Sequence, residues 1–137
     1  RDSRSSRGLG DVYKRQVVSL MADSIQWNGP NGSTVGIEVL KESIQFWIDN
    51  FEDVSFEEGS GLPGTNTGYW GGNTYPTAEA MSGPNNVRMY GVWSMKNSNT
   101  GKTAKVKSYA VLNFNEDGKV IEATEYGSYA SVLETFE

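Results

Sequence analysis

Acid–base chemistry in this protein must rest on carboxylates and tyrosines, because its 137 residues include no histidine and no cysteine. Without histidine the chain lacks the commonest general base at neutral pH and every Ser-His-Asp or Cys-His arrangement. Without either residue type it also lacks thiol nucleophiles, disulfides and nearly all zinc geometries. We therefore expect no metal and no other cofactor, and any catalysis would use Asp, Glu, Tyr, Lys or Arg.

Aromatic side chains are the second group that could form a site. For any one of them, burial in the core is the simpler interpretation. Tyr and Trp also carry a hydrogen-bond donor each, and an apolar pocket with a few convergent polar groups is the usual form of a small-molecule site. A tyrosine could further polarise a ligand carbonyl. The residues predicted to line such a pocket are Trp27, Trp47, Tyr90, Trp93, Tyr109 and Tyr126.

The first sixteen residues differ in character from the rest. The segment SRGLGDVYKRQ, residues 6–16, reads as the translation of a transposase-type sequencing adapter. We interpret residues 1–16 as a non-native segment in front of a single domain at 17–137, so that the chain is a reading frame from a shotgun, metagenomic read. In that case a signal peptide could have been lost with the native N-terminus. The localisation therefore stays open, with the cytoplasm as the default.

Setting that segment aside changes the charge of the domain. Residues 17–137 carry seven Lys and Arg against fifteen Asp and Glu, a net charge of −8. Such an acidic domain would repel phosphate backbones, so we expect no nucleic-acid partner. No apolar run reaches membrane-spanning length, and we expect no membrane partner either.

Hydrophobic spacing predicts one α+β domain. The first half should contain the last turns of a helix, a short strand, a long amphipathic helix and a second strand, at residues 17–22, 25–28, 35–50 and 53–58. The second half should be an antiparallel meander with a short helix or tail after it, at residues 87–96, 103–115, 119–126 and 128–136. An Asp-Gly pair at residues 117–118 gives the second hairpin its turn.

Residues 59–86 form a long segment rich in glycine and proline. Tyr69 and Trp70 could fold over the mouth of a pocket as a lid, although a mobile surface loop is an equal alternative. The glycines lack the spacing and the strand-loop-helix context of a phosphate-binding fingerprint.

The order of elements and three passages resemble the SnoaL-like branch of the nuclear-transport-factor-two-like superfamily. The passages are MADSIQWNGPNG, TGKTAKVKSYAVLNFNEDGKV and GKVIEATEYGSYASVL, at residues 21–32, 100–120 and 118–133. The resemblance covers residues 17–136. It implies a cone, in which a strongly curved, mostly antiparallel sheet wraps around helices and leaves a central pocket. The first helix of the family would be truncated here.

The resemblance also suggests candidate site residues. SnoaL-like enzymes often end their last strand in a pattern similar to G-K-I-V-E-H-W-E-V-F-D. Here the histidine position is Ala123, the tryptophan position is Thr124, which we include among the pocket residues, and the final aspartate position is Ser128. Glu125 remains and could act as a base if the pocket removed it from water, although a solvated strand carboxylate is the simpler interpretation.

Asp23 is the second candidate base, because the family often has acidic residues where the first helix meets the first strand. Capping or local hydrogen bonding explains such an aspartate more simply than catalysis does.

The fold alone does not give the function. We favour a non-enzymatic domain that holds a small apolar or aromatic ligand in its cone pocket. One alternative is a cofactor-independent lyase, isomerase, cyclase or dehydratase that uses Glu125 or Asp23 with a tyrosine. Another is a homodimerisation module with a filled pocket, whose outward residues between 87 and 115 form an apolar patch. Catalysis requires a carboxylate inside the pocket and within reach of a donor.

Overall fold

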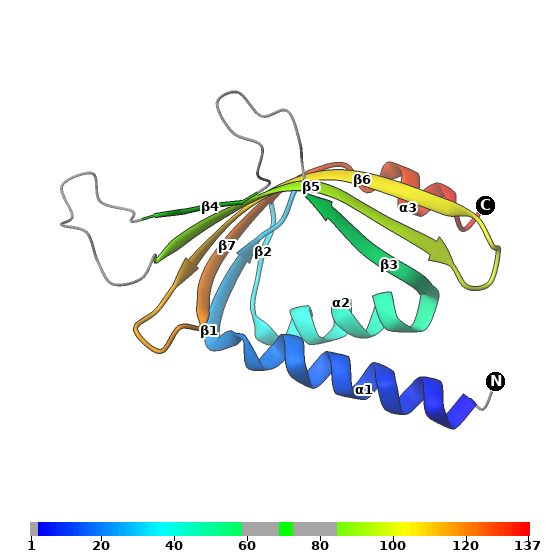
Figure 1. Ribbon diagram of the computed structural model, residues 1–137, viewed down its shortest axis with the longest axis horizontal. Helices are drawn as coiled ribbons and strands as arrows, with labels where there is room; N and C mark the ends of the chain where they lie inside the picture. The colour runs from blue at the N-terminus through cyan, green and yellow to red at the C-terminus, as the bar shows by residue number, and fades with distance from the viewer. Residues whose placement is uncertain (1–2, 59–68, 73–84) are drawn as a thin grey trace.

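One strongly curved sheet forms the body of the protein (Figure 1). The computed structural model describes residues 3–58, 69–72 and 85–137. Within them the strand order is β2-β1-β7-β6-β5-β3, and β4 also pairs with β5. The strands are β1 (Met21–Asn28), β2 (Thr34–Val35), β3 (Phe51–Glu58), β4 (Tyr69–Gly72), β5 (Asn86–Asn97), β6 (Thr103–Phe114) and β7 (Val120–Tyr126).

Two helices lie together on the concave side of this sheet (Figure 1). They are α1 (Ser3–Ser19) and α2 (Ile37–Asn50), and a short third helix, α3 (Ala130–Glu134), follows β7. The pairing of β1 with β7 is parallel, and the other strand pairs are antiparallel. The predicted α+β cone with a mostly antiparallel sheet is therefore confirmed.

The predicted meander of three long strands is present. Eleven consecutive residue pairs join β5 to β6, from Asn86 opposite Asn113 to Lys96 opposite Thr103. The two turns of the meander place Gly101 and Gly118 at φ angles of 74° and 75°. Glycine adopts this left-handed backbone region without steric cost, which is why the Asp-Gly signal located the second turn correctly.

The first strand begins earlier than the local pattern predicts. Helix α1 ends at Ser19 and β1 begins at Met21, so residues 17–22 are only partly helical. Met21 lies opposite Val120 of β7, and the Val120 N–H donates to the carbonyl of Leu20 at 2.8 Å. Pairing with a strand distant in sequence thus overrides the local helical pattern.

The second strand of the prediction also begins earlier. Phe51, two residues before the predicted start, is the first residue of β3, and the register against β5 shifts between Glu52 and Ser55. Asp53 takes a φ angle of 53° at this bulge. Aspartate tolerates the left-handed region better than most residues, which allows the strand to bend there.

Helix α1 packs on α2, and at Gly10 its backbone lies directly against the side chain of Ile48. A Cβ atom at Gly10 would lie 2.7 Å from Cγ2 of Ile48, so only glycine fits without movement. The Lys14 ammonium donates to Oε1 of Gln45 at 3.1 Å. The segment that we interpret as non-native from its sequence therefore occupies the place of a first helix on the concave side.

Two clusters of buried side chains fill the inside of the curved sheet. Phe51, Met95, Ala104, Val106 and Val132 form the first, and Ile25, Leu40, Val120 and Ala123 form the second. Trp93 packs at the edge of the first cluster, and Trp27 and Leu112 pack at the edge of the second. The cavity described below lies among these edge residues.

Gly91 provides a test of the packing of β3 on β5. A Cβ atom there would lie 2.4 Å from both the carbonyl oxygen of Glu57 and Cζ of Phe56. We expect Gly91→Ala to lower the free energy of unfolding in urea by about 3 kcal/mol because of this overlap. Gly36→Ala is the control, since its Cβ would meet nothing closer than the Ile25 carbonyl oxygen at 4.0 Å. Equal losses in the two variants would contradict the packing described.

Candidate functional site

The register of the meander decides which side chains face the helices. Ser108, Ala110 and Leu112 alternate along one face of β6, and Leu112 and Ala110 lie opposite Ala123 and Glu125 of β7. Residues directly opposite each other in an antiparallel pair share a face. The last strand therefore turns Ala123 and Glu125 inward, toward α1 and α2.

An apolar cavity of about 180 Å³ lies on this inner face. Its walls come from five strands, from Val17 near the end of α1 and from Leu20, which follows that helix. Most of the lining is aliphatic or aromatic, and Ser108 and Glu125 add a hydroxyl and a carboxylate. The other residues that line it are Met21, Trp27, Phe56, Met89, Trp93, Ala110, Leu112 and Val120.

Glu125 is the ionisable group of this cavity. The Tyr129 hydroxyl donates a hydrogen bond to Oε1 of its carboxylate. Burial raises the pKa of Glu125 above its ordinary value because the charged form loses water, and the hydrogen bond from Tyr129 opposes that rise. The protonated form is thus more accessible near neutral pH than it is for an ordinary surface glutamate.

Tyr129 is held in place from two directions. It precedes α3 directly, and its ring packs on Trp47 of α2 with centroids 5.9 Å apart. Burial, together with the neighbouring Glu125 carboxylate, raises the pKa of Tyr129. The phenol therefore stays protonated and acts as a hydrogen-bond donor across the ordinary pH range.

The far end of α3 is fixed to the turn between β5 and β6. The fully buried Asn97 amide donates to Oγ1 of Thr135 at 3.3 Å, and the Thr100 hydroxyl donates to the Thr135 carbonyl at 2.7 Å. The Asn97 side-chain oxygen accepts from the backbone N–H groups of Asn99 and Thr100. Because both ends of α3 are tied down, Tyr129 keeps its position beside Glu125.

Three of the predicted site residues meet at the cavity. Trp27, Trp93 and Glu125 all line it. Trp47 instead lines a second pocket, described below. Asp23 is exposed and lies inside β1, so it does not meet the requirement for a pocket base.

The predicted tyrosines lie on the opposite face of the sheet. Tyr90, Tyr109 and Tyr126 are paired in register across β5, β6 and β7, and their rings stack with centroids 4.7 and 5.7 Å apart. Because Ser108 and Ala110 face inward, Tyr109 between them faces outward. Burial and Tyr90 raise the pKa of Tyr109, and Tyr126 is 59% exposed. These tyrosines do not line the cavity.

Thr124 also faces outward, between Ala123 and Glu125. Its hydroxyl accepts a hydrogen bond from the Asn28 side chain at 3.1 Å, which supports the parallel pairing of β1 and β7. Most of the segment 59–86, predicted as a lid or a mobile loop, lies outside the described residues. The two residues named there, Tyr69 and Trp70, belong to β4 and pair with Met89 and Arg88.

Two polar residues of the site were not predicted from the sequence, nor were the aliphatic residues of the lining. Ser108 follows the apolar-polar alternation of β6 and could have been found once the inward face was known. Tyr129 lies in the segment 128–136, which was predicted only as a short helix or tail, but it stands four residues after Glu125. Its role depends on the turn of the chain between β7 and α3, which no local pattern predicts.

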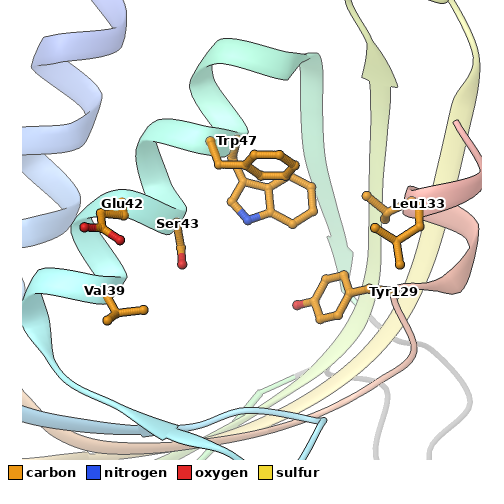
Figure 2. Close-up of a pocket in the computed structure, with 8 residues that line it drawn as sticks. Val39, Glu42, Ser43, Trp47, Tyr129 and Leu133 are labelled. Carbon is orange, nitrogen blue, oxygen red and sulfur yellow. The ribbon is translucent and has the colours of Figure 1, made fainter. Parts of the chain in front are cut away.

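A second pocket, of about 360 Å³, opens between α2 and α3 (Figure 2). Figure 2 shows Val39, Glu42 and Ser43 on the α2 side, Tyr129 and Leu133 opposite them, and Trp47 between. Phe46 and Val132 complete the lining. Tyr129 therefore lies between the inner cavity and the second pocket, since its hydroxyl donates to Glu125 and its ring lines the second pocket.

Among the described residues, no group of three or more Asp, Glu, His or Cys side chains is placed to hold a metal ion. None of the helices in the described part of the chain has the length and apolar character needed to cross a membrane.

Comparison with solved structures identifies the class of fold. An NTF2-like protein from Burkholderia thailandensis is 14% identical and has a TM-score of 0.60, with 96% of this chain and 92% of that chain covered. A hypothetical protein from Catenulispora acidiphila, with a ketosteroid isomerase-like fold and in complex with trimethylamine, is 14% identical with a TM-score of 0.58, over 89% and 80% of the two chains. The chain therefore has the NTF2-like fold, as the sequence predicts.

The same fold includes enzymes. The BvnE pinacolase from Penicillium brevicompactum is 12% identical with a TM-score of 0.61, and the match covers 85% of this chain and 73% of that chain. No protein-family model matches the sequence, and no curated protein matches it. These similarities show the fold, so the activity must be argued from the cavity itself.

The raised pKa of Glu125 predicts a pH-dependent stability. Since the folded state binds this proton more tightly than the unfolded state, the contribution of Glu125 to stability is greatest in acid and falls as the pH rises from the ordinary glutamate pKa through the raised one. We expect Glu125→Gln to gain free energy of unfolding relative to the wild type across that window, measured by urea unfolding. The exposed Asp23→Asn variant should follow the wild type. Parallel pH profiles for wild type and Glu125→Gln would contradict the assignment.

Proposed function

We propose that the inner cavity binds a small apolar carbonyl compound and that Glu125 transfers a proton to and from it. The observation that carries this proposal is a half-buried carboxylate in an apolar cavity, hydrogen-bonded by a tyrosine that is itself fixed. This arrangement meets the requirement set out above for a pocket base, whereas Asp23 does not. The proposal thus moves from the binding module favoured on sequence grounds to a cofactor-independent proton-transfer site.

The chemistry follows from the environment of Glu125. A general base works best when its pKa lies near the operating pH, and burial moves the Glu125 pKa in that direction. The ionised carboxylate would take a proton from the carbon next to the ligand carbonyl and return it to the same or a neighbouring carbon. Ser108, Trp27 and Trp93 line the cavity, and each carries a hydrogen-bond donor that could stabilise the enolate oxygen formed between these steps.

Tyr129 acts as a positioning residue in this proposal. Its hydroxyl holds one carboxylate oxygen of Glu125, which leaves the second oxygen for the ligand. The pinacolase among the similar structures supports the idea that this fold can build a catalytic cone, but its reaction is not transferred to this chain.

Exchange of carbon-bound hydrogen tests the proposal without knowledge of the natural ligand. Cyclohexanone in D2O is the probe, and NMR follows the loss of the protons next to its carbonyl. We expect the protein to accelerate this exchange and Glu125→Gln to remove about a hundredfold or more of the acceleration, as loss of a general base does. Glu122→Gln, an exposed glutamate on the same strand, is the matched control and should exchange at the wild-type rate.

Binding is measured separately by the shift in melting temperature with cyclohexanone. A shift in melting temperature without any acceleration of exchange would support a binding module and refute the proton-transfer step. No shift and no acceleration would refute both parts of the proposal.

The outer face of the sheet supports a second candidate function, self-association. The stacked Tyr90, Tyr109 and Tyr126 form a ladder of rings on that face, with Val92 and Val111 on the same side of β5 and β6. Aromatic side chains are enriched at protein interfaces because they bury a large area and still carry a polar group. We propose that this face forms a homodimer.

Light scattering and sedimentation test the dimer. We expect a dimer for the wild type and a shift toward monomer for Tyr126→Lys, because a charge would be placed at the exposed end of the ladder. Leu133→Lys, an exposed apolar residue on α3, is the control and should leave the mass unchanged. A wild-type monomer at high protein concentration would refute this candidate.

A further inference from the structure

The pocket between α2 and α3 has the composition of a site for an organic cation. Three aromatic rings meet at its wall, with Phe46 and Trp47 edge to face at 6.0 Å and 78°, and Trp47 and Tyr129 inclined at 5.9 Å and 52°. Rings set at such angles present a face and edges to the same volume, so a guest meets more than one π surface.

The charges around this pocket favour a cation. Glu42 lines it, and none of the residues that line it is Lys or Arg. The nearby Lys41 pairs with Glu38 at 3.3 Å on the same helix. Figure 2 shows Glu42 on the α2 side of the pocket and the Tyr129 ring on the opposite side. A guest against the aromatic rings would therefore have a negative charge at the rim of the same pocket.

The hydrogen bond between Tyr129 and Glu125 strengthens the preference of the pocket for a cation. The Tyr129 hydroxyl donates to the Glu125 carboxylate, which shifts electron density of the phenol toward its ring. An electron-rich ring attracts a cation more strongly, since the attraction follows the negative potential of the ring face.

We propose that the α2–α3 pocket binds a small alkylated ammonium ion, such as a trimethylammonium group. Its methyl groups suit Val39, Val132 and Leu133, and its diffuse charge suits the rings and Glu42. A metal ion or a bare ammonium ion keeps its water too firmly for such a lining, and a neutral apolar guest would make no use of Glu42. This site is separate from the cavity at Glu125 and does not depend on the proposed proton transfer.

Choline and its uncharged analogue 3,3-dimethylbutan-1-ol distinguish a cation site from an apolar pocket of the same size. Each is titrated into the full chain at constant ionic strength, and NMR follows the indole N–H signal of Trp47. We expect saturable binding of choline, and weaker binding of the analogue by about fivefold or more. Equal affinity for the two compounds, or no saturable shift with choline, would overturn the proposal.

Variants of two exposed residues locate the site. Phe46→Leu keeps the apolar volume but removes a ring, and Glu42→Gln removes the charge. We expect each to weaken choline binding by about threefold and to leave the affinity for the neutral analogue unchanged. Glu116→Gln, an exposed glutamate in the turn between β6 and β7 and outside the pocket, is the control and should bind choline as the wild type does. Wild-type affinity in both pocket variants would refute the assignment to this pocket.

Discussion

The antiparallel register of β5, β6 and β7 is the constraint on which the rest of this structure depends. Side chains alternate between the two faces of a strand, so a slip of one residue would exchange the inner and outer sets completely. With the observed register Ala110 lies opposite Glu125, and Tyr109 lies opposite Tyr126. The inner face thereby receives a carboxylate in an apolar cavity, and the outer face receives a ladder of tyrosines.

Burial of the Glu125 carboxylate costs stability, and the contacts around it offset part of that cost. A half-buried glutamate loses hydration, and the rise in its pKa expresses that loss. The hydrogen bond from Tyr129 returns part of the stabilisation, but it requires the start of α3 to stand beside the end of β7. The contacts of Thr135 with Asn97 and Thr100 hold the other end of α3 and so support the site from a distance.

The sequence predicts the fold better than the site because the two rest on different kinds of information. Hairpin turns, helix periodicity and strand alternation are local, and they located α2 and the meander to within about two residues. Which face of β5 points inward is not local: Met89 and Trp93 alternate with Tyr90 and Val92, and both sets are apolar enough to be buried. The tyrosines were therefore expected at the cavity although they face outward, and Tyr129 was missed because the turn of the chain after β7 brings it back to Glu125.

The most direct test of the central claim is the pKa of the Glu125 carboxyl group, measured by carbon-13 NMR titration in the wild type and in Tyr129→Phe. The structure predicts a wild-type pKa above that of an ordinary glutamate. It predicts a further rise in Tyr129→Phe, because that variant keeps the apolar surroundings and loses the hydrogen bond that favours the charged form. An ordinary pKa that does not change in the variant would contradict a desolvated carboxylate held by Tyr129 at the cavity.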